Sequence, residues 1–284
     1  MRISEVYGGT KIPLSYEIFP PRGELPMQEA HRVLAGIAEL DPAFVSVTFS
    51  AGGSGNSELT SEITQHGQES LGLTMMSHLT CMGASKEDIQ RHIELMKGRG
   101  VQNVMALRGD PRPDTTTTDF HYAADLIPVL REAGFCVGGA CYPEGHVSSL
   151  DLDEDVRYLR AKQDAGAEFL VSQLFFDNRF AYRFLDRCRA ARIRIPISFG
   201  IMPFTSKAQV SRMIFMCGAS LPSPLVKLLA KYEDKPEDLQ KAGIEYAISQ
   251  LIGLANHGVD GLHLYSMNKP EVAAEIAEAV KPYL

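Results

Sequence analysis

The sequence contains little that would place the protein outside the cytoplasm. Its five cysteines form no CxxC pair and no metal-ligand spacing, so no metal site is predicted and most should be small buried residues in a reducing compartment. No apolar run approaches membrane-spanning length, and no basic segment followed by an apolar core opens the chain. These absences predict a cytoplasmic protein with no membrane partner.

Basic residues are outnumbered by acidic ones, 28 to 35. The formal net charge is −7 over 284 residues, which argues against a general nucleic-acid-binding surface and against nucleic acid as a partner. An anionic ligand is still compatible, because it needs only a locally positive pocket. Phosphate-binding fingerprints are missing as well: Gly52–Gly55 lacks the strand, turn and helix around GxGxxG spacing, and no GxxxxGKS or GxxxxGKT loop occurs.

What the sequence does contain is a series of apolar runs, most of them spaced by roughly thirty residues, the length of a strand, a helix and two short loops. Most runs lack strict alternation, which is typical of strands in a parallel sheet covered on both faces. We therefore predict a single-domain (β/α)8 TIM barrel over residues 1–284. A doubly wound open sheet is the alternative, but it needs a reversal of strand order and leaves sheet edges. The predicted strands are Leu14–Phe19, Phe44–Phe49, Thr74–Cys81, Asn103–Leu107, Cys136–Tyr142, Phe169–Phe176, Ile195–Ile201 and Gly261–Ser266.

Local signals mark the ends of the helices between these strands. Ser85 predicts an N-cap with Asp88 three positions on, and Ser206 with Gln209 resembles a capping box. The strand spacing roughly doubles before the eighth strand, where the sequence predicts two helices, the second inside Pro236–His257. Left-handed helix C-caps are expected at four glycines: Gly100, Gly134, Gly166 and Gly258.

Glu17 is the first residue that could carry chemistry. It stands inside an apolar strand, and burial raises the pKa of a carboxyl, which makes it a competent general acid near neutrality. The alternatives are a solvated carboxylate or a pair with Arg22. Polar residues at the ends of several other strands favour the catalytic interpretation, because those ends meet at one mouth in a parallel barrel.

Two further strand ends carry polar groups. Arg108, Gly109 and Asp110 offer a cation, an unhindered backbone amide and a carboxylate, a turn that can receive a phosphate or a polar heterocycle. The alternative is a structural turn with an internal Arg–Asp pair. His78 could be a ligand or an acid, but for a lone histidine a hydrogen-bonded core position is the favoured interpretation.

Further polar residues lie near the ends of the fifth and sixth predicted strands and on the helix between them. Tyr142 and His146 combine a stacking ring with donors, while Asp155 and Lys162, seven positions apart, share one helix face for which a solvated role is the ordinary explanation. Gln173 lies in an apolar run, so its amide must find partners if it is buried. A bidentate amide suits a heterocycle with alternating donors and acceptors.

Seven motifs in order resemble the methylenetetrahydrofolate reductase family. They extend from near Tyr16 to Asn268, and although any one of them is weak, seven in the same order are highly specific. The chain is similar to the short, catalytic-barrel form of that family. The motifs are Ser15–Pro21 (SYEIFPP), Phe44–Thr48 (FVSVT), Ser77–Cys81 (SHLTC), Ala106–Asp110 (ALRGD), Tyr142–His146 (YPEGH), Asp164–Ala167 (DAGA) and Ser172–Asp177 (SQLFFD).

The resemblance implies an FAD-containing (β/α)8 barrel. Such an enzyme reduces 5,10-methylenetetrahydrofolate to 5-methyltetrahydrofolate with NADH or NADPH by a ping-pong cycle and feeds methyl groups to methionine synthesis. By the same resemblance, Glu17 matches the general acid that protonates folate N10 and opens the ring to an N5 iminium. Asp110 matches the carboxylate beside flavin and folate that would stabilise this cation.

The resemblance also implies binding residues. Gln173, Gln209 and Lys269 match folate-binding positions, in addition to Glu17. The positions that match flavin contacts are Thr48, Ala51, His78, Arg108, Gly109, Asp110, Tyr122, Ala123, Tyr142, His146, Asp155 and Lys162.

The chain departs from the family pattern at two positions. Lys269 stands where the family usually has arginine, which keeps the charge but loses the planar fork that binds a carboxylate bidentately. Met213 stands where members that use NADH often have phenylalanine. One alternative is therefore a catalytic subunit that receives electrons from a partner protein, and another is a flavin-free barrel lyase or methyltransferase. We also expect a homo-oligomer, since apolar positions on the outer helices can form an interface.

Overall fold

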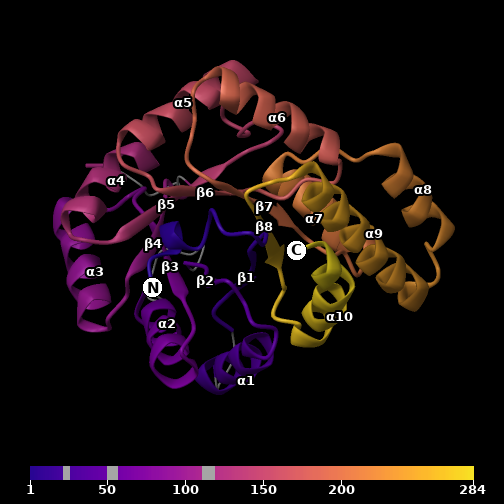
Figure 1. Ribbon diagram of the computed structural model, residues 1–284, viewed down its shortest axis with the longest axis horizontal. Helices are drawn as coiled ribbons and strands as arrows, with labels where there is room; N and C mark the ends of the chain where they lie inside the picture. Colours follow the sequence, from indigo (N-terminus) through magenta and orange to yellow (C-terminus); the bar gives the residue numbers. More distant parts are fainter. Residues whose placement is uncertain (22–25, 50–56, 111–118) are drawn as a thin grey trace.

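Eight parallel strands pair in chain order and close into a barrel in the computed structural model (Figure 1). The structure describes residues 1–21, 26–49, 57–110 and 119–284. The ring closes because β1 pairs with β8, in a register that joins Ser15 to His263 and Glu17 to Tyr265. The predicted barrel is confirmed and the open sheet is excluded. The strands are β1 (Leu14–Ile18), β2 (Val45–Val47), β3 (Met75–Thr80), β4 (Asn103–Leu107), β5 (Cys136–Cys141), β6 (Phe169–Ser172), β7 (Ile197–Ile201) and β8 (Gly261–Tyr265).

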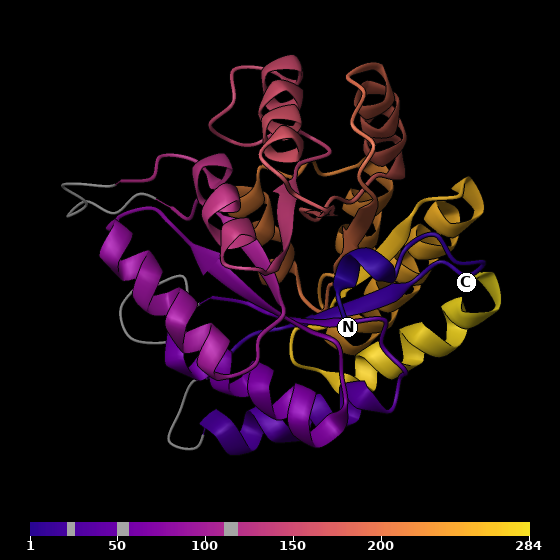
Figure 2. The ribbon, with the colours of Figure 1, turned by 60° about the vertical axis from the view of Figure 1, so that its left-hand side comes forward.

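Helices surround the strands as an outer ring (Figures 1 and 2). Over the ranges described, none of them combines the length and the apolar character needed to cross a bilayer. The helices are α1 (Pro26–Ala38), α2 (Ser57–Leu71), α3 (Lys86–Gly98), α4 (Ala123–Glu132), α5 (Leu152–Asp164), α6 (Asn178–Ala190), α7 (Lys207–Cys217), α8 (Ser223–Lys231), α9 (Pro236–His257) and α10 (Pro270–Val280), with 3-10 turns at Ile3–Glu5 and Lys281–Tyr283.

The helix signals were largely correct. Ser85 and Asp88 form the full capping box of α3, and the four predicted glycines have φ from +66° to +108°. Ser206 Oγ accepts from Gln209 N, but Gln209 Oε1 accepts from Thr205 N instead of closing the box on Ser206. The prediction of two helices before β8 was wrong, because α8 lies there between α7 and α9, with proline in its first turn.

Several predicted strands extend too far at their C-terminal ends. The sixth was predicted to reach Phe176, yet β6 ends at Ser172, and Phe175 and Phe176 are buried beyond the sheet. Apolar residues continue there because the loop packs under α9: Tyr246 donates to Phe176 O and Gln250 donates to Phe175 O. The strands therefore stop early, and their following residues are free to form the mouth of the barrel.

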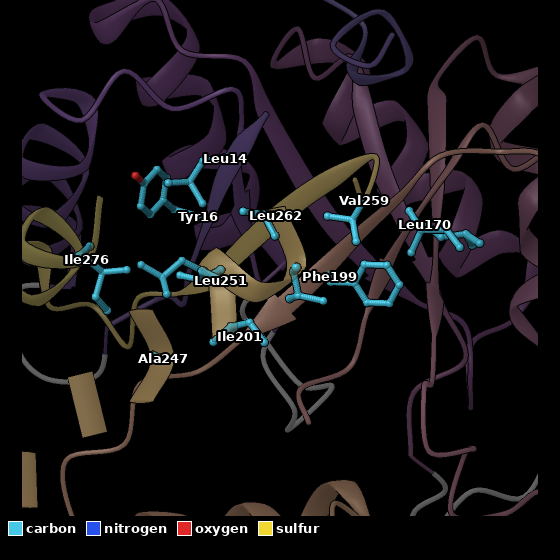
Figure 3. Close-up of a cluster of buried hydrophobic side chains, with 14 of the residues drawn as sticks. Leu14, Tyr16, Leu170, Phe199, Ile201, Ala247, Leu251, Val259, Leu262 and Ile276 are labelled. Atoms are coloured by element: carbon cyan, nitrogen blue, oxygen red, sulfur yellow. The ribbon is translucent and has the colours of Figure 1, made fainter. Parts of the chain in front are cut away.

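The two faces of each strand have different surroundings. Outward side chains of β1, β7 and β8 pack against α9 and α10, as Leu14, Phe199, Leu262, Leu251 and Ile276 show in Figure 3. The alternate residues point into the barrel. Its lower interior is apolar and includes the buried side chains of Ile3, Phe44, Met76, Cys136 and Phe169.

The N-terminal segment closes the lower end of the barrel, within the ring of helices in Figure 1. Ile3 N donates to Asn103 Oδ1 at 2.8 Å, and Asn103 Nδ2 donates to Met1 O and Met75 O. Nearby, Glu168 pairs with Arg2 and Arg131. This end is therefore filled, whereas the opposite end, at the C-terminal ends of the strands, holds a cavity.

Candidate active site

A cavity of about 380 Å³ occupies the C-terminal mouth of the barrel. Its size lies within the range of about 300–1,000 Å³ that is usual for small-molecule sites. Residues of β1–β6 and β8, or of the loops that follow them, supply its wall together with the end of α7. Nine residues predicted for the site lie here together: Glu17, Thr48, His78, Arg108, Gly109, Asp110, Tyr142, His146 and Gln173.

Glu17 points into the barrel from β1 with its side chain one-fifth exposed. Its Oε2 atom lies 3.7 Å from His78 Nε2, 3.8 Å from His263 Nε2 and 3.5 Å from Ser46 Oγ, which donates to it. The alternative partner Arg22 falls outside the residues that the structure describes. Glu17 is thus neither a solvated surface carboxylate nor, within the described chain, an ion-pair partner of lysine or arginine.

His78 is not a hydrogen-bonded core histidine, although that interpretation was favoured. It is 8% exposed and lines the cavity, and its Nε2 atom has no hydrogen-bond partner. Burial lowers the pKa of His78, against the opposing effect of Glu17, so the imidazole is neutral near pH 7. The structure therefore presents an uncharged imidazole to the cavity.

The turn at residues 108–110 is built by its backbone. Gly109 has φ of +80°, and a Cβ there would lie 3.0 Å from Thr80 Cβ, so glycine is required on both counts. Met82 N donates to Arg108 O at 2.7 Å, which ties the turn to the loop after β3. No Arg108–Asp110 ion pair occurs between these two described residues, so the internal-pair alternative is wrong and both charges face the cavity.

Tyr142 and His146 are held in place by contacts with Asp155 and Lys162 of α5. His146 packs edge-on against Tyr142 with ring centroids 4.7 Å apart, and burial lowers the pKa of His146. Asp155 accepts from His146 N and Ser149 Oγ, while Lys162 donates to Ala140 O at 2.7 Å and lies over the Tyr142 ring. The solvated-face alternative for Asp155 and Lys162 is therefore wrong. They lie behind the wall of the cavity and support it.

The sequence did not point to Tyr265, which also lines the cavity. Its hydroxyl donates to Ser172 O at 2.7 Å, and burial raises its pKa well above the usual value. A Cβ on Gly200 of β7 would lie 2.6 Å from both Ser172 O and the Tyr265 ring, so this glycine makes room for the tyrosine. The alternation of His263 and Tyr265 within β8 was the available signal, since both face inward.

Gln173 and the end of α7 complete the cavity. Gln173 Oε1 accepts from Leu174 N, which fixes the amide at the end of β6. Val147, Met216 and Cys217 form an apolar rim that the sequence also did not indicate. Burial raises the pKa of the Cys217 thiol to about 11, so it is neutral at physiological pH. Gln173 thus faces both polar and apolar walls.

Besides Asp155 and Lys162, four predicted residues within the described part of the chain do not line this cavity. Gln209 and Lys269 line a separate cavity of about 190 Å³ between the loops that follow β7 and β8. There the Gln209 amide is bonded to Thr205 and Pro203. Tyr122 and Ala123 begin α4, where the exposed Tyr122 ring stacks on Tyr158 at 5.6 Å. Ala51 lies outside the described residues.

The main cavity fits a flat, polar heterocycle such as the flavin ring. It combines a cation at Arg108, an unpartnered imidazole nitrogen at His78 and a close backbone approach at Gly109. Tyr142 and Tyr265 add aromatic side chains to its lining. This set of donors and rings is compatible with a heterocycle that carries alternating donors and acceptors.

Comparison with known proteins identifies one family and relatives of two lengths. The family described as methylenetetrahydrofolate reductase matches residues 2–281. Methylenetetrahydrofolate reductase 1 of Schizosaccharomyces pombe is 35% identical over 276 residues, which cover 94% of this chain and 46% of that protein. The 5,10-methylenetetrahydrofolate reductase of Pectobacterium carotovorum is 32% identical over 279 residues, 98% of this chain and 92% of that protein. The chain therefore spans about half of the first relative and nearly all of the second.

One solved structure supports the fold. An uncharacterized protein from Clostridium thermocellum, described as binding two copies of 5-methyl-5,6,7,8-tetrahydrofolic acid, aligns with a TM-score of 0.68. The alignment covers 99% of this chain and 97% of that one at 15% identity. At this identity the likeness shows a shared barrel architecture and nothing finer.

Proposed function

This chain belongs to the methylenetetrahydrofolate reductase family, and we propose that it reduces 5,10-methylenetetrahydrofolate to 5-methyltetrahydrofolate. The electrons would come from NADH or NADPH through bound FAD in a ping-pong cycle. One observation carries the proposal: Glu17, Asp110 and Gln173 come from distant parts of the chain and line a single cavity with Arg108. That combination supplies an acid, an anion, an amide and a cation around one ligand.

FAD would be held by residues that line the main cavity. Arg108, His78 and the Gly109 backbone would bind the polar edge of the ring, and Tyr142 would contact its face. Asp155 and Lys162 would act indirectly, because they hold His146 and Tyr142 in place. Tyr122 and Ala123, at the start of α4, would contact the more distant part of the cofactor. When bound, the flavin supplies the hydride chemistry.

Glu17 would act as the general acid toward folate. Proton transfer from its carboxyl to N10 breaks the bond between N10 and the bridging carbon, which leaves an iminium at N5. The Asp110 carboxylate lies in the same cavity and would stabilise this cation, because a fixed anion in a partly dry site interacts strongly with developing positive charge. Gln173 would orient the pterin through its amide.

Gln209 and Lys269 would bind a more distant part of the folate. They line the smaller cavity beside the loop after β8, and Lys269 could attract a carboxylate as a point charge. Because the Gln209 amide already bonds to Thr205 and Pro203, we propose that it shapes this cavity more than it contacts the ligand.

An anaerobic titration tests the function. Purified protein should show flavin absorbance, lose it when NADH or NADPH is added, and regain it when methylenetetrahydrofolate follows. A second outcome would favour a partner protein as the electron donor. In that case neither nicotinamide reduces the bound flavin, but methylenetetrahydrofolate reoxidises the flavin after dithionite has reduced it. A colourless protein that binds no added FAD would favour a flavin-free barrel enzyme and contradict the proposal.

A further inference from the structure

The turn that follows β8 has an unfavourable backbone conformation. Lys269 N donates to Ser266 O at 3.0 Å and closes the turn. The two residues between them, Met267 and Asn268, have φ of +53° and +56°. This pattern is typical of a type I′ turn, which asparagine fits but methionine adopts only at a steric cost. Strain of this kind persists only where neighbouring contacts enforce it, and it is concentrated at functional sites.

The side chain of Asn268 enforces the turn. Its Oδ1 atom accepts from Phe19 N at 3.0 Å, and its Nδ2 atom donates to Phe19 O at 2.8 Å. The amide therefore pairs with both backbone groups of one residue, as a neighbouring strand does in a sheet. The paired strands β1 and β8 extend as far as Glu17 and Tyr265, so these two hydrogen bonds, the Asn268 clamp, continue the pairing beyond the strands.

Ser266 attaches the start of the turn to the same segment. Its backbone N and its Oγ donate to Glu17 O at 3.2 and 2.6 Å. Ser266 is 1% exposed, whereas Phe19 is 40% exposed, so the Asn268 clamp orders backbone at the protein surface. Closure of the barrel does not require the clamp, because β1 and β8 already pair through four residues of each strand.

The turn supplies part of the lining of the smaller cavity. Tyr265 lines the main cavity, and the residues that follow it, Ser266, Met267 and Lys269, line the smaller one. Met267 also packs against the cluster of buried side chains around Phe204. The geometry of the turn therefore determines where its side chains stand in the smaller cavity. The rest of the lining comes from the loop after β7, from α7 and from α10: Pro203, Thr205, Ser206, Gln209 and Val272.

The smaller cavity favours a negatively charged group. Lys269 is the one cation among the described residues that line it, and none of those residues is acidic. Ser206 Oγ accepts from Gln209 N, so this hydroxyl still has its own proton to donate. A carboxylate suits these two donors. Because the lysine side chain is long and flexible, its backbone must be held in place if the charge is to be used efficiently.

We propose that Asn268 is a positioning residue, which clamps Phe19 so that the turn holds Lys269 beside a carboxylate of the substrate. Asn268 itself lines neither cavity, so it acts through its neighbour. The inference deepens the proposed reductase function and rests on it for the identity of the substrate. It assigns the strained turn to substrate binding and not to the chemical step.

Kinetics with two substrates test the clamp. The amide of methylenetetrahydropteroate keeps the reacting rings of methylenetetrahydrofolate but has an uncharged carboxamide in place of the glutamate. Asn268→Gly removes the clamp without adding strain, because glycine adopts positive φ freely. The KM for methylenetetrahydrofolate should rise about tenfold, as expected when a hydrogen bond to a charged group is weakened. The KM for the amide should stay within about twofold of wild type, and kcat should be unchanged with both substrates, since binding alone is affected.

Three results of this experiment would overturn the proposal: an equal rise in KM for both substrates, a fall in kcat, or an unchanged KM for methylenetetrahydrofolate. Asn178→Ala is the matched control. Asn178 Nδ2 donates to Gln250 O at 2.9 Å and its Oδ1 accepts from Gln250 Nε2 at 3.2 Å, which joins α6 to α9 away from both cavities. Both KM values should stay within about twofold of wild type in this variant.

A double-mutant cycle tests whether Asn268 acts through Lys269. Lys269→Met removes the charge and keeps a long side chain, so the KM for methylenetetrahydrofolate should rise. Adding Asn268→Gly to that variant should raise this KM by less than about twofold more, because the two residues contribute to one interaction. A further tenfold rise would show that they act independently and would contradict the proposal.

Hydrogen exchange of the wild-type protein tests the clamp without any substitution. The Phe19 amide should exchange at least about tenfold more slowly than an unprotected amide. Added 5-methyltetrahydrofolate should slow it further, whereas the amide of 5-methyltetrahydropteroate should not. Free exchange at Phe19, or equal slowing by both compounds, would overturn the proposal. A protein that shows the expected exchange pattern but does not reduce methylenetetrahydrofolate would contradict the proposed function and support the role of Asn268.

Discussion

The two ends of the barrel treat their polar groups in opposite ways. At the lower end, the buried Asn103 makes three hydrogen bonds and Glu168 pairs with two arginines. At the mouth, the imidazoles of His78 and His263 leave nitrogens unpartnered beside Glu17. The lower end is thus arranged for stability, and the mouth holds buried imidazole nitrogens that have no hydrogen-bond partner within the described protein.

The largest effect should come from removing the carboxyl at the mouth. Glu17→Gln keeps the size of the side chain but supplies no acidic proton, so we expect folate reduction to fall by about 10²–10⁴-fold. Flavin reduction by the nicotinamide should be retained, because it needs no proton from Glu17. Single-turnover measurements of the two half-reactions check this difference.

Glu144→Gln is the control for that variant. Glu144 is also a half-buried carboxyl near the mouth, and burial raises its pKa, but it accepts from Ser220 N and does not line the cavity. Folate reduction should stay within about twofold of wild type. An equal loss in both variants would show that the charge of the whole rim matters, and the assignment of Glu17 would fail.

The second effect belongs to the lower end. Asn103→Ala removes the partners of Ile3 N, Met1 O and Met75 O, and we expect the free energy of unfolding to fall by about 2–4 kcal/mol. Turnover by the folded protein should be unchanged. Urea unfolding measures the first quantity. Gln102→Ala, which removes an exposed partner of the N-terminus, should cost less than about 0.5 kcal/mol.

The sequence indicated residues at the mouth of the barrel but not the contacts at its lower end. Strand spacing located all eight strands, and Glu17, His78, Arg108 and Gln173, which come from the family motifs, line one cavity. The lower end was not anticipated, because Asn103 opens a strand and its partner Ile3 lies a hundred residues away. Such contacts follow from the closure of the barrel and leave no local pattern.

The same limit explains the residues missed at the mouth. His263 and Tyr265 were included in a predicted strand, but only the register of β8 against β1 places them beside Ser15 and Glu17. The charged face of Asp155 and Lys162 looked solvated because the sequence does not show that the loop after β5 covers it. Spacing gives the order of elements, whereas register and loop packing decide which side chains meet.

A third variant tests the packing of the mouth. Gly200→Ala places a Cβ at 2.6 Å from both Ser172 O and the Tyr265 ring, so one of them must move. We expect a loss of about 1–3 kcal/mol in stability, with weaker folate binding as Tyr265 shifts. Gly139→Ala is the matched control, since its Cβ would meet Leu170 at an ordinary 3.4 Å. If Gly200→Ala had wild-type stability and KM, Tyr265 would not be held as tightly as the structure indicates.

The smallest effect concerns pH and should distinguish the two ends. Burial lowers the pKa of His78 below the unfolded value of about 6.5. As the pH falls below that value, His78 is protonated in the unfolded chain before it is protonated in the folded protein. This contribution to stability is complete above pH 6.5 and is lost as the pH falls through the folded pKa. His78→Gln should therefore flatten the decline in unfolding free energy between pH 7 and pH 5. The deficit of Asn103→Ala should stay constant over the same range, because its contacts carry no titrating group. A parallel decline in wild type and His78→Gln would assign the acid sensitivity to residues away from the mouth.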